Sequence, residues 1–181
     1  QEELGEIITD EKNIYEELQQ LYAGNPDILS KIRFYENDAI SLGTLYSFET
    51  QIQRAISERV WMKSGAYLII QPTEALTVID VNSGKNTSGK NAEEYYYKIN
   101  LEAASEIARQ LRLRNISGIV IVDFINMAKE EQRKELMHQF RLSLKEDPVP
   151  VRLVDITKLG LVELTRKKER KTLLEQVAQL R

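Results

Sequence analysis

The hydrophobic pattern of this chain centres on a strand, a long helix and a second strand that follow one another. Apolar and β-branched residues dominate 76–82 and again 119–124, which predicts two buried strands. Between them, residues 92–114 carry apolar positions every three or four residues, as one face of an amphipathic helix does. This order predicts a crossover unit whose two strands lie side by side and parallel.

The remaining pattern predicts further elements around this unit. We expect helices between residues 11 and 24 and over about 48–60, 129–145 and 169–180, and strands over 32–35, 67–70 and 151–154. The strand at 67–70 and the strand at 76–82 should form a hairpin. The predicted fold class is therefore α/β, with a mixed sheet flanked by helices.

Composition narrows the class of protein. The chain has 181 residues, of which 42% are hydrophobic and 29% charged, and this is typical of a soluble globular domain. No run approaches the roughly 20 apolar residues of a membrane span, and the N-terminus lacks a signal sequence, so we expect a cytoplasmic protein. The absence of cysteine excludes disulfides and cysteine-ligated zinc, and a single histidine, His138, argues against a catalytic triad.

The charge of the chain is unevenly distributed. A net charge of −3 argues weakly against a nucleic-acid partner. Positive residues nevertheless gather around the strand–helix–strand unit, namely Lys85, Lys90, Arg109, Arg112 and Arg114. Such residues commonly form a solvated face, so their position alone does not identify a partner.

Two aspartates lie where the predicted strands end. Asp80 and Asp123 should emerge at the same edge of the sheet, where α/β proteins place their chemistry. Each could simply accept hydrogen bonds from nearby amides, but two like charges close together repel unless a cation lies between them. Mg²⁺ prefers such oxygen ligands. Asn82, two residues after Asp80, should share its face of the strand and could orient a water or a phosphate oxygen.

The segment 83–90 is small and polar, with two glycines and two lysines, so a phosphate backbone could approach it closely. It lacks the order and spacing of a P-loop. A metal site beside such a loop suits phosphodiester hydrolysis, in which Mg²⁺ generates hydroxide and offsets the developing charge.

Three long motifs resemble the catalytic region of the ribonuclease E/G family, which are bacterial endoribonucleases of RNA processing and decay. They are TVIDVNSGK at 77–85, NLEAASEIARQLRLRNISGIVIVDFINM at 100–127 and KLGLVELTRK at 158–167. The resemblance implies that Asp80 and Asp123 hold a catalytic Mg²⁺ and that Asn82 assists. It also implies that residues 1–54 are the end of an RNase H-like subdomain and residues 55–181 a DNase I-like catalytic subdomain.

The chain departs from the family pattern in several places. Asn126 replaces a second acid of some members, and Lys85 stands where others carry Arg. Nothing resembles the family's OB-fold RNA-binding domain, its pocket for the RNA 5′ monophosphate or the cysteine pair that shares zinc between subunits. We therefore expect a catalytic fragment that has little or no activity alone, taken from a protein that forms a homo-oligomer.

The leading hypothesis is a Mg²⁺-dependent endoribonuclease that cleaves single-stranded RNA, held in a groove by Lys85, Lys90 and Arg112. Phe124 and residues 95–97 are candidate aromatics for base stacking, although core packing is the stronger expectation for each. One alternative is a non-catalytic RNA-binding or dimerisation module that needs further domains for cleavage. Another is a different Mg²⁺-using α/β domain, such as a phosphatase or a receiver, which is disfavoured because a receiver needs acids at its first strand.

Two roles are considered for Glu163 and Arg166. Glu163 and Arg166 in the third motif either make structural pairs or touch RNA, and the structural role is favoured.

Overall fold

The computed structural model describes residues 4–84 and 92–179, and these form two units, residues 1–53 and residues 54–181. Lys85 and Lys90 lie outside the described residues. No helix among those described is long and apolar enough to cross a membrane.

The N-terminal unit is small and contains short elements. Its two strands pair in parallel, with Ile7 opposite Ile32, and the first helix lies between them in the chain. The elements are β1 (Ile7–Thr9), α1 (Lys12–Leu21), α2 (Pro26–Leu29), β2 (Ile32–Phe34), α3 (Leu42–Leu45) and most of α4 (Phe48–Ile56).

The second unit is built on a six-stranded mixed sheet with the order β3-β4-β5-β6-β8-β7. Its elements are β3 (Arg59–Trp61), β4 (Tyr67–Pro72), β5 (Leu76–Asn82), α5 (Ala92–Arg114), β6 (Gly118–Asp123), α6 (Glu130–Leu144), β7 (Val151–Ile156), β8 (Val162–Arg166) and α7 (Leu173–Gln179). Strands β5 and β6 are parallel, and the other pairs are antiparallel. This confirms the predicted α/β class with a mixed sheet and the predicted crossover unit.

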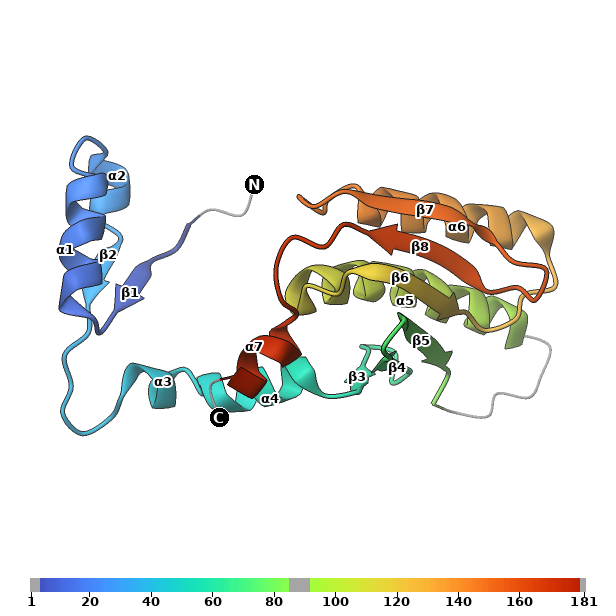
Figure 1. Cartoon of the computed structure of the whole chain (residues 1–181), viewed down its shortest axis with the longest axis horizontal. Coiled ribbons are helices and arrows are strands. Elements are labelled where there is room, and N and C mark those ends of the chain that lie inside the picture. The colour runs from blue at the N-terminus through green and yellow to red at the C-terminus, as the bar shows by residue number, and fades with distance from the viewer. Residues whose placement is uncertain (1–3, 85–91, 180–181) are drawn as a thin grey trace. The chain divides into compact units, whose positions relative to one another are not determined.

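One face of the sheet is buried beneath helices α5 and α6, which run behind β6, β8 and β7 in Figure 1. Alternate strand residues point into this core, as the two-residue period of a strand requires. The core combines Leu68, Ile70, Ile79, Val81, Val120, Val122, Val162 and Leu164 from the strands with Ile99, Ala103, Ile107, Leu111, Leu136, Phe140 and Leu144 from the two helices.

The residues in between point to the opposite side, which we call the outer face of the sheet. It carries Arg59 and Trp61 from β3, Tyr67 and Ile69 from β4, Asp80 and Asn82 from β5, and Asp123 from β6. All of them are exposed or half-buried. The outer face is therefore where a ligand can reach this sheet.

Two expectations about the elements were wrong. The helix predicted over 48–60 ends at Ile56, and Arg59–Trp61 is a strand instead. The segment Val162–Arg166, for which no strand was expected, inserts as β8 between β6 and β7. Its inward residues are Val162, Leu164 and Arg166, so a buried arginine interrupts the apolar alternation that would indicate a strand.

Candidate metal and nucleic-acid site

Asp80 and Asp123 are direct register partners on the parallel strands β5 and β6. The preceding pair in the register, Ile79 and Val122, points into the core, so both aspartates point to the outer face. Parallel neighbours are about 4.8 Å apart across a sheet. Both side chains are exposed. The structure therefore brings the two predicted carboxylates together where solvent, an ion or a phosphate can reach them.

Asn82 joins this pair through a hydrogen bond. Its Nδ2 donates to Oδ2 of Asp80 at 2.7 Å, so the amide orients the Asp80 carboxylate. No hydrogen bond or ion pair joins the Asp123 carboxylate to the part of the chain that the structure describes. One carboxylate is thus held in place, and the other is available to a cation.

These donors fit a hard divalent cation. They are oxygen atoms of two adjacent carboxylates, and Mg²⁺ is commonly held by one or two carboxylates together with water and substrate phosphate. Within residues 4–84 and 92–179, no group of three or more His, Cys, Asp or Glu side chains could enclose a metal. The arrangement therefore suits an ion that keeps several exchangeable ligands and does not suit a closed structural metal centre.

The helix between the two strands fixes the segment after Asp123. Asn100 of α5 is fully buried, and its side chain makes two hydrogen bonds to the backbone of Ile125. Its Nδ2 donates to the Ile125 carbonyl at 2.8 Å, and its Oδ1 accepts from the Ile125 amide at 3.0 Å. Because Ile125 lies two residues beyond Asp123, this contact holds the chain where it leaves β6.

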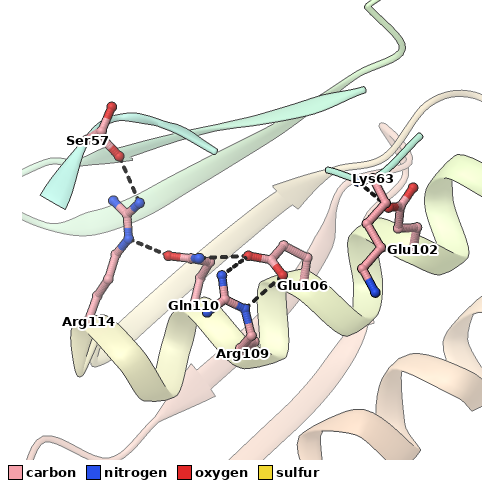
Figure 2. Close-up of polar contacts among 7 residues, drawn as sticks. All are labelled: Ser57, Lys63, Glu102, Glu106, Arg109, Gln110 and Arg114. Carbon is pink, nitrogen blue, oxygen red and sulfur yellow. Dashed lines mark hydrogen bonds and ion pairs between the residues drawn. The ribbon is translucent and has the colours of Figure 1, made fainter. Parts of the chain in front are cut away.

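The segment after Asn82 is fixed by close backbone packing. Gly84 has φ +70°, and a Cβ added to it would clash with the carbonyl oxygen of Gly65 in the turn between β3 and β4. That turn is held in place by Glu102 of α5, whose Oε1 accepts from the Lys63 amide at 2.7 Å (Figure 2). The same oxygen accepts from the Ser64 amide at 3.3 Å.

Glu102 begins a row of polar residues along α5, spaced four residues apart, which holds both ends of β3 (Figure 2). At the far end of the row, Arg114 donates through Nη2 to the Ser57 carbonyl at 2.7 Å and through Nε to Gln110 at 2.6 Å. Gln110 in turn donates to Glu106 at 2.7 Å. Through these contacts the row supports the edge strand β3 at both of its ends.

The surroundings of this row shift the pKa values of two of its residues. Burial by itself would raise the pKa of Glu106, but hydrogen bonds from Arg109 and Gln110 outweigh it and hold that pKa below its ordinary value. Burial lowers the pKa of Arg114. The members of the row are thus joined by hydrogen bonds that involve charged side chains.

Two residues that the sequence suggested for contact with RNA, Arg112 and Phe124, do not lie on the outer face. Arg112 contacts the end of α6, donating to the Ser143 carbonyl at 3.4 Å and lying 3.6 Å from Glu146, so the structure does not bring it to the outer face. Phe124 is buried against Phe140, with ring centroids 5.7 Å apart. Core packing was the stronger expectation for Phe124, and the structure confirms it.

Arg166 and Glu163 have different surroundings. Arg166 is buried and pairs with Asp147, at 2.8 Å between Nε and Oδ2, so its role is structural. Glu163 lies opposite Ile121 on the outer face and does not pair with Arg166. They lie three positions apart on one strand, so their side chains point to opposite faces.

A cleft with a volume of about 630 Å³ begins immediately after Asp123. It lies between the end of β6, helix α6 and the turn from β7 to β8. Its charged lining residues are Arg133, Lys134, Arg141, Lys158, Glu130 and Asp155. Sequence reasoning did not find this cleft, because its cations come from segments that only the fold brings together.

Comparison with known proteins is consistent with these motifs. The model of the Ribonuclease E/G family matches residues 1–169. Ribonuclease G of Salmonella typhimurium is 40% identical over 171 residues, covering 94% of this chain and 35% of that protein. Ribonuclease E of Escherichia coli is 38% identical over 169 residues, covering 92% of this chain and 16% of that protein.

A third relative, Ribonuclease E of Synechocystis, is 44% identical over 142 residues, covering 78% of this chain and 21% of that protein. The chain thus spans about a third of the length of the ribonuclease G relative and less of the two ribonuclease E relatives. The match to the family model covers nearly all of the chain and includes Asp80, Asn82 and Asp123. The chain belongs to the Ribonuclease E/G family.

Proposed function

We propose that this chain carries the catalytic site of a Mg²⁺-dependent endoribonuclease that hydrolyses single-stranded RNA. The observation that carries the proposal is the pairing of Asp80 with Asp123 on the exposed face of two parallel strands. The relatives named ribonuclease support the reaction class. RNA as the substrate and Mg²⁺ as the cofactor are part of the proposal.

Asp80 and Asp123 would hold the ion, and Asn82 would keep the Asp80 carboxylate in its binding orientation. When bound, Mg²⁺ polarises the phosphate and supplies a hydroxide nucleophile at neutral pH. The chain itself orients the Asp80 carboxylate and leaves both carboxylates open to solvent, so water can enter. No side chain of the chain has to act as a nucleophile.

The cleft beside Asp123 supports an anionic, extended substrate. Its lining includes an ion pair between Arg133 and Glu130, at 2.9 Å, which offsets both charges. The other charged lining residues are three cations, Lys134, Arg141 and Lys158, and one acid, Asp155. An RNA strand that crosses the aspartates could continue along these cations, because phosphate contacts position a nucleic acid without reading its sequence.

Cleavage of a short fluorescent single-stranded RNA in the presence of Mg²⁺ tests the proposal. We expect Asp80→Ala and Asp123→Ala each to reduce the cleavage rate by at least about a hundredfold, because each removes a ligand of the ion. Glu74→Ala is the matched control, since it removes an exposed acid from the other end of the same hairpin. Cleavage by the two aspartate variants at the same measurable rate as by the parent chain would refute the proposal.

The same assay distinguishes the proposed function from the non-catalytic alternative. A chain that binds the RNA and never cuts it, with either Mg²⁺ or Mn²⁺, would be a non-catalytic RNA-binding module. Cytoplasmic location and assembly into a homo-oligomer in the complete protein stay predictions.

A further inference from the structure

We propose that Trp61, Tyr67 and Arg59 form a stacking platform for a base of single-stranded RNA, beside the aspartate pair on the outer face. The inference rests on the proposed function for its ligand and adds to it a second contact with the substrate. The platform was not among the aromatic residues suggested by the sequence.

The sheet register aligns the platform with the site. One row across the outer face runs from Arg59 through Ile69 and Asp80 to Asp123. The next row runs from Trp61 through Tyr67 to Asn82. With strands about 4.8 Å apart, Trp61 lies on the order of 10 Å from Asn82 across the sheet.

The three side chains have the composition that stacking requires. The rings of Trp61 and Tyr67 are tilted, with centroids 5.1 Å apart. The Arg59 guanidinium carbon lies 4.6 Å from the centroid of Tyr67 and 5.6 Å from that of Trp61. Aromatic faces and arginine planes are the surfaces on which single-stranded RNA stacks its bases, whatever their sequence.

Trp61 is 63% exposed, whereas a tryptophan usually buries most of its surface. An exposed ring beside a cation is complementary to a flat base that is followed by a phosphate. Single-stranded RNA is therefore the occupant that we assign, because the adjoining row already presents a site for its phosphodiester.

Helix α5 anchors the backbone on both sides of β3, the strand that carries two residues of the platform. Arg114 fixes the Ser57 carbonyl before β3, and Glu102 fixes the turn after it (Figure 2). Only the three residues Arg59–Trp61 lie in the strand between these two anchors. A surface that is ordered in advance costs less conformational entropy when its ligand binds.

Trp61 is the only tryptophan of the chain, so its fluorescence reports on this surface directly. The experiment titrates the 181-residue chain with a ten-nucleotide uridine RNA in EDTA, where cleavage cannot occur. We expect the RNA to quench Trp61. An otherwise equal strand without bases and a blunt RNA duplex should quench it much less, because neither offers a free base.

Variants are compared by the fluorescence anisotropy of a labelled RNA. Trp61→Leu should weaken binding on the order of tenfold, and Trp61→Phe by less, because Phe keeps an aromatic face. Phe48→Leu is the matched control, since Phe48 is an exposed aromatic residue of α4, outside the sheet. Circular dichroism shows whether each variant is folded.

The outcomes distinguish this inference from the proposed function. Absence of quenching, or equal RNA affinities of Trp61→Leu and the parent chain, would overturn the platform even if Mg²⁺-dependent cleavage is found. Quenching that persists in Asp80→Ala, together with loss of affinity in Trp61→Leu, would support the platform even if the chain never cleaves RNA.

Discussion

Gly84 illustrates how single residues hold this site in place. It follows Asn82 by two positions, has φ +70° and lies against the Gly65 carbonyl with no room for a Cβ. The left-handed backbone conformation alone costs a residue other than glycine about 1–2 kcal/mol. The clash with Gly65 adds to this cost, and it can be relieved only if one of two backbone segments moves: the segment that carries Asp80 and Asn82, or the turn at Gly65.

We therefore expect Gly84→Ala to lower the free energy of unfolding by more than about 2 kcal/mol and to weaken Mn²⁺ binding. Gly118→Ala is the control, because Gly118 has φ +84° but nothing within 4 Å of an added Cβ. It should show the backbone cost alone, with unchanged Mn²⁺ affinity. Urea denaturation and metal titration measure both quantities. Equal effects of the two variants would contradict the packing argument.

At the scale of elements, α5 connects the parts of the site. The carboxylate of Glu102 accepts two backbone amides of the turn between β3 and β4. Glu102→Ala should speed hydrogen exchange of the Lys63 and Ser64 amides, on the order of tenfold for a lost bond worth about 1.4 kcal/mol. Glu102→Gln keeps an acceptor oxygen and should exchange nearly as slowly as the parent chain.

Nuclear magnetic resonance provides this measurement residue by residue. Glu106→Ala serves as the comparison. It breaks hydrogen bonds within α5, four residues after Glu102, and leaves the contacts of the β3–β4 turn intact. Unchanged exchange in Glu102→Ala would mean that the turn is stable without α5.

The central elements could be predicted from the sequence, because the hydrophobic period within each segment and the order of the segments determine them. The spacing of Ile99, Ala103 and Ile107 specifies the buried face of α5, and a strand on each side specifies the crossover that pairs Asp80 with Asp123. The strands β3 and β8 could not be predicted in this way. Arg59–Trp61 has only three residues, and β8 buries an arginine whose partner is remote in the sequence.

The contacts that position the site could not be predicted from the local sequence pattern either. Asn100 and Glu102 act on backbone amides and carbonyls, and only the tertiary fold determines which backbone atoms they meet. The platform of Arg59, Trp61 and Tyr67 depends on the register between β3 and β4. We expected a helix over about 48–60 and therefore did not predict β3.

At the scale of the whole molecule, a buried polar network around Arg166 connects several elements of the second unit. Arg166 binds Asp147 at the end of α6 and donates through Nη1 to Asn115 after α5. Asn115 in turn donates to the carbonyls of Arg170 and Lys171, which lead into α7. One arginine thus joins the ends of several elements. The assignment of residues 1–54 to an RNase H-like subdomain and of 55–181 to a DNase I-like subdomain stays a prediction.

This network predicts a pH dependence of stability. Burial by itself would raise the pKa of Asp147, but hydrogen bonds from Arg166 and the Val149 amide outweigh it and hold the pKa below its ordinary value of 3.8. A lowered folded-state pKa adds stability above the unfolded value, and this stability is lost as pH falls through the folded value. The contribution should therefore be complete near neutral pH and disappear below about pH 4.

We expect Asp147→Asn to lower the free energy of unfolding by about 3 kcal/mol at pH 7, because it leaves the Arg166 charge buried without a partner. The difference from the parent chain should shrink as pH falls below 4. Glu175→Gln is a suitable control, since Glu175 also has a lowered pKa, through hydrogen bonds from Thr172, but is exposed. A difference that is independent of pH would contradict the ionic account.

A crystal structure of the 181-residue chain soaked in MnCl₂ tests the central claim most directly, because Mn²⁺ replaces Mg²⁺ at oxygen sites and has an anomalous signal. We predict one strong anomalous peak between β5 and β6, about 2 Å from carboxylate oxygens of both Asp80 and Asp123. The peak should be absent in Asp123→Ala crystals. Carboxylates that point apart, or manganese bound only elsewhere on the chain, would contradict the account.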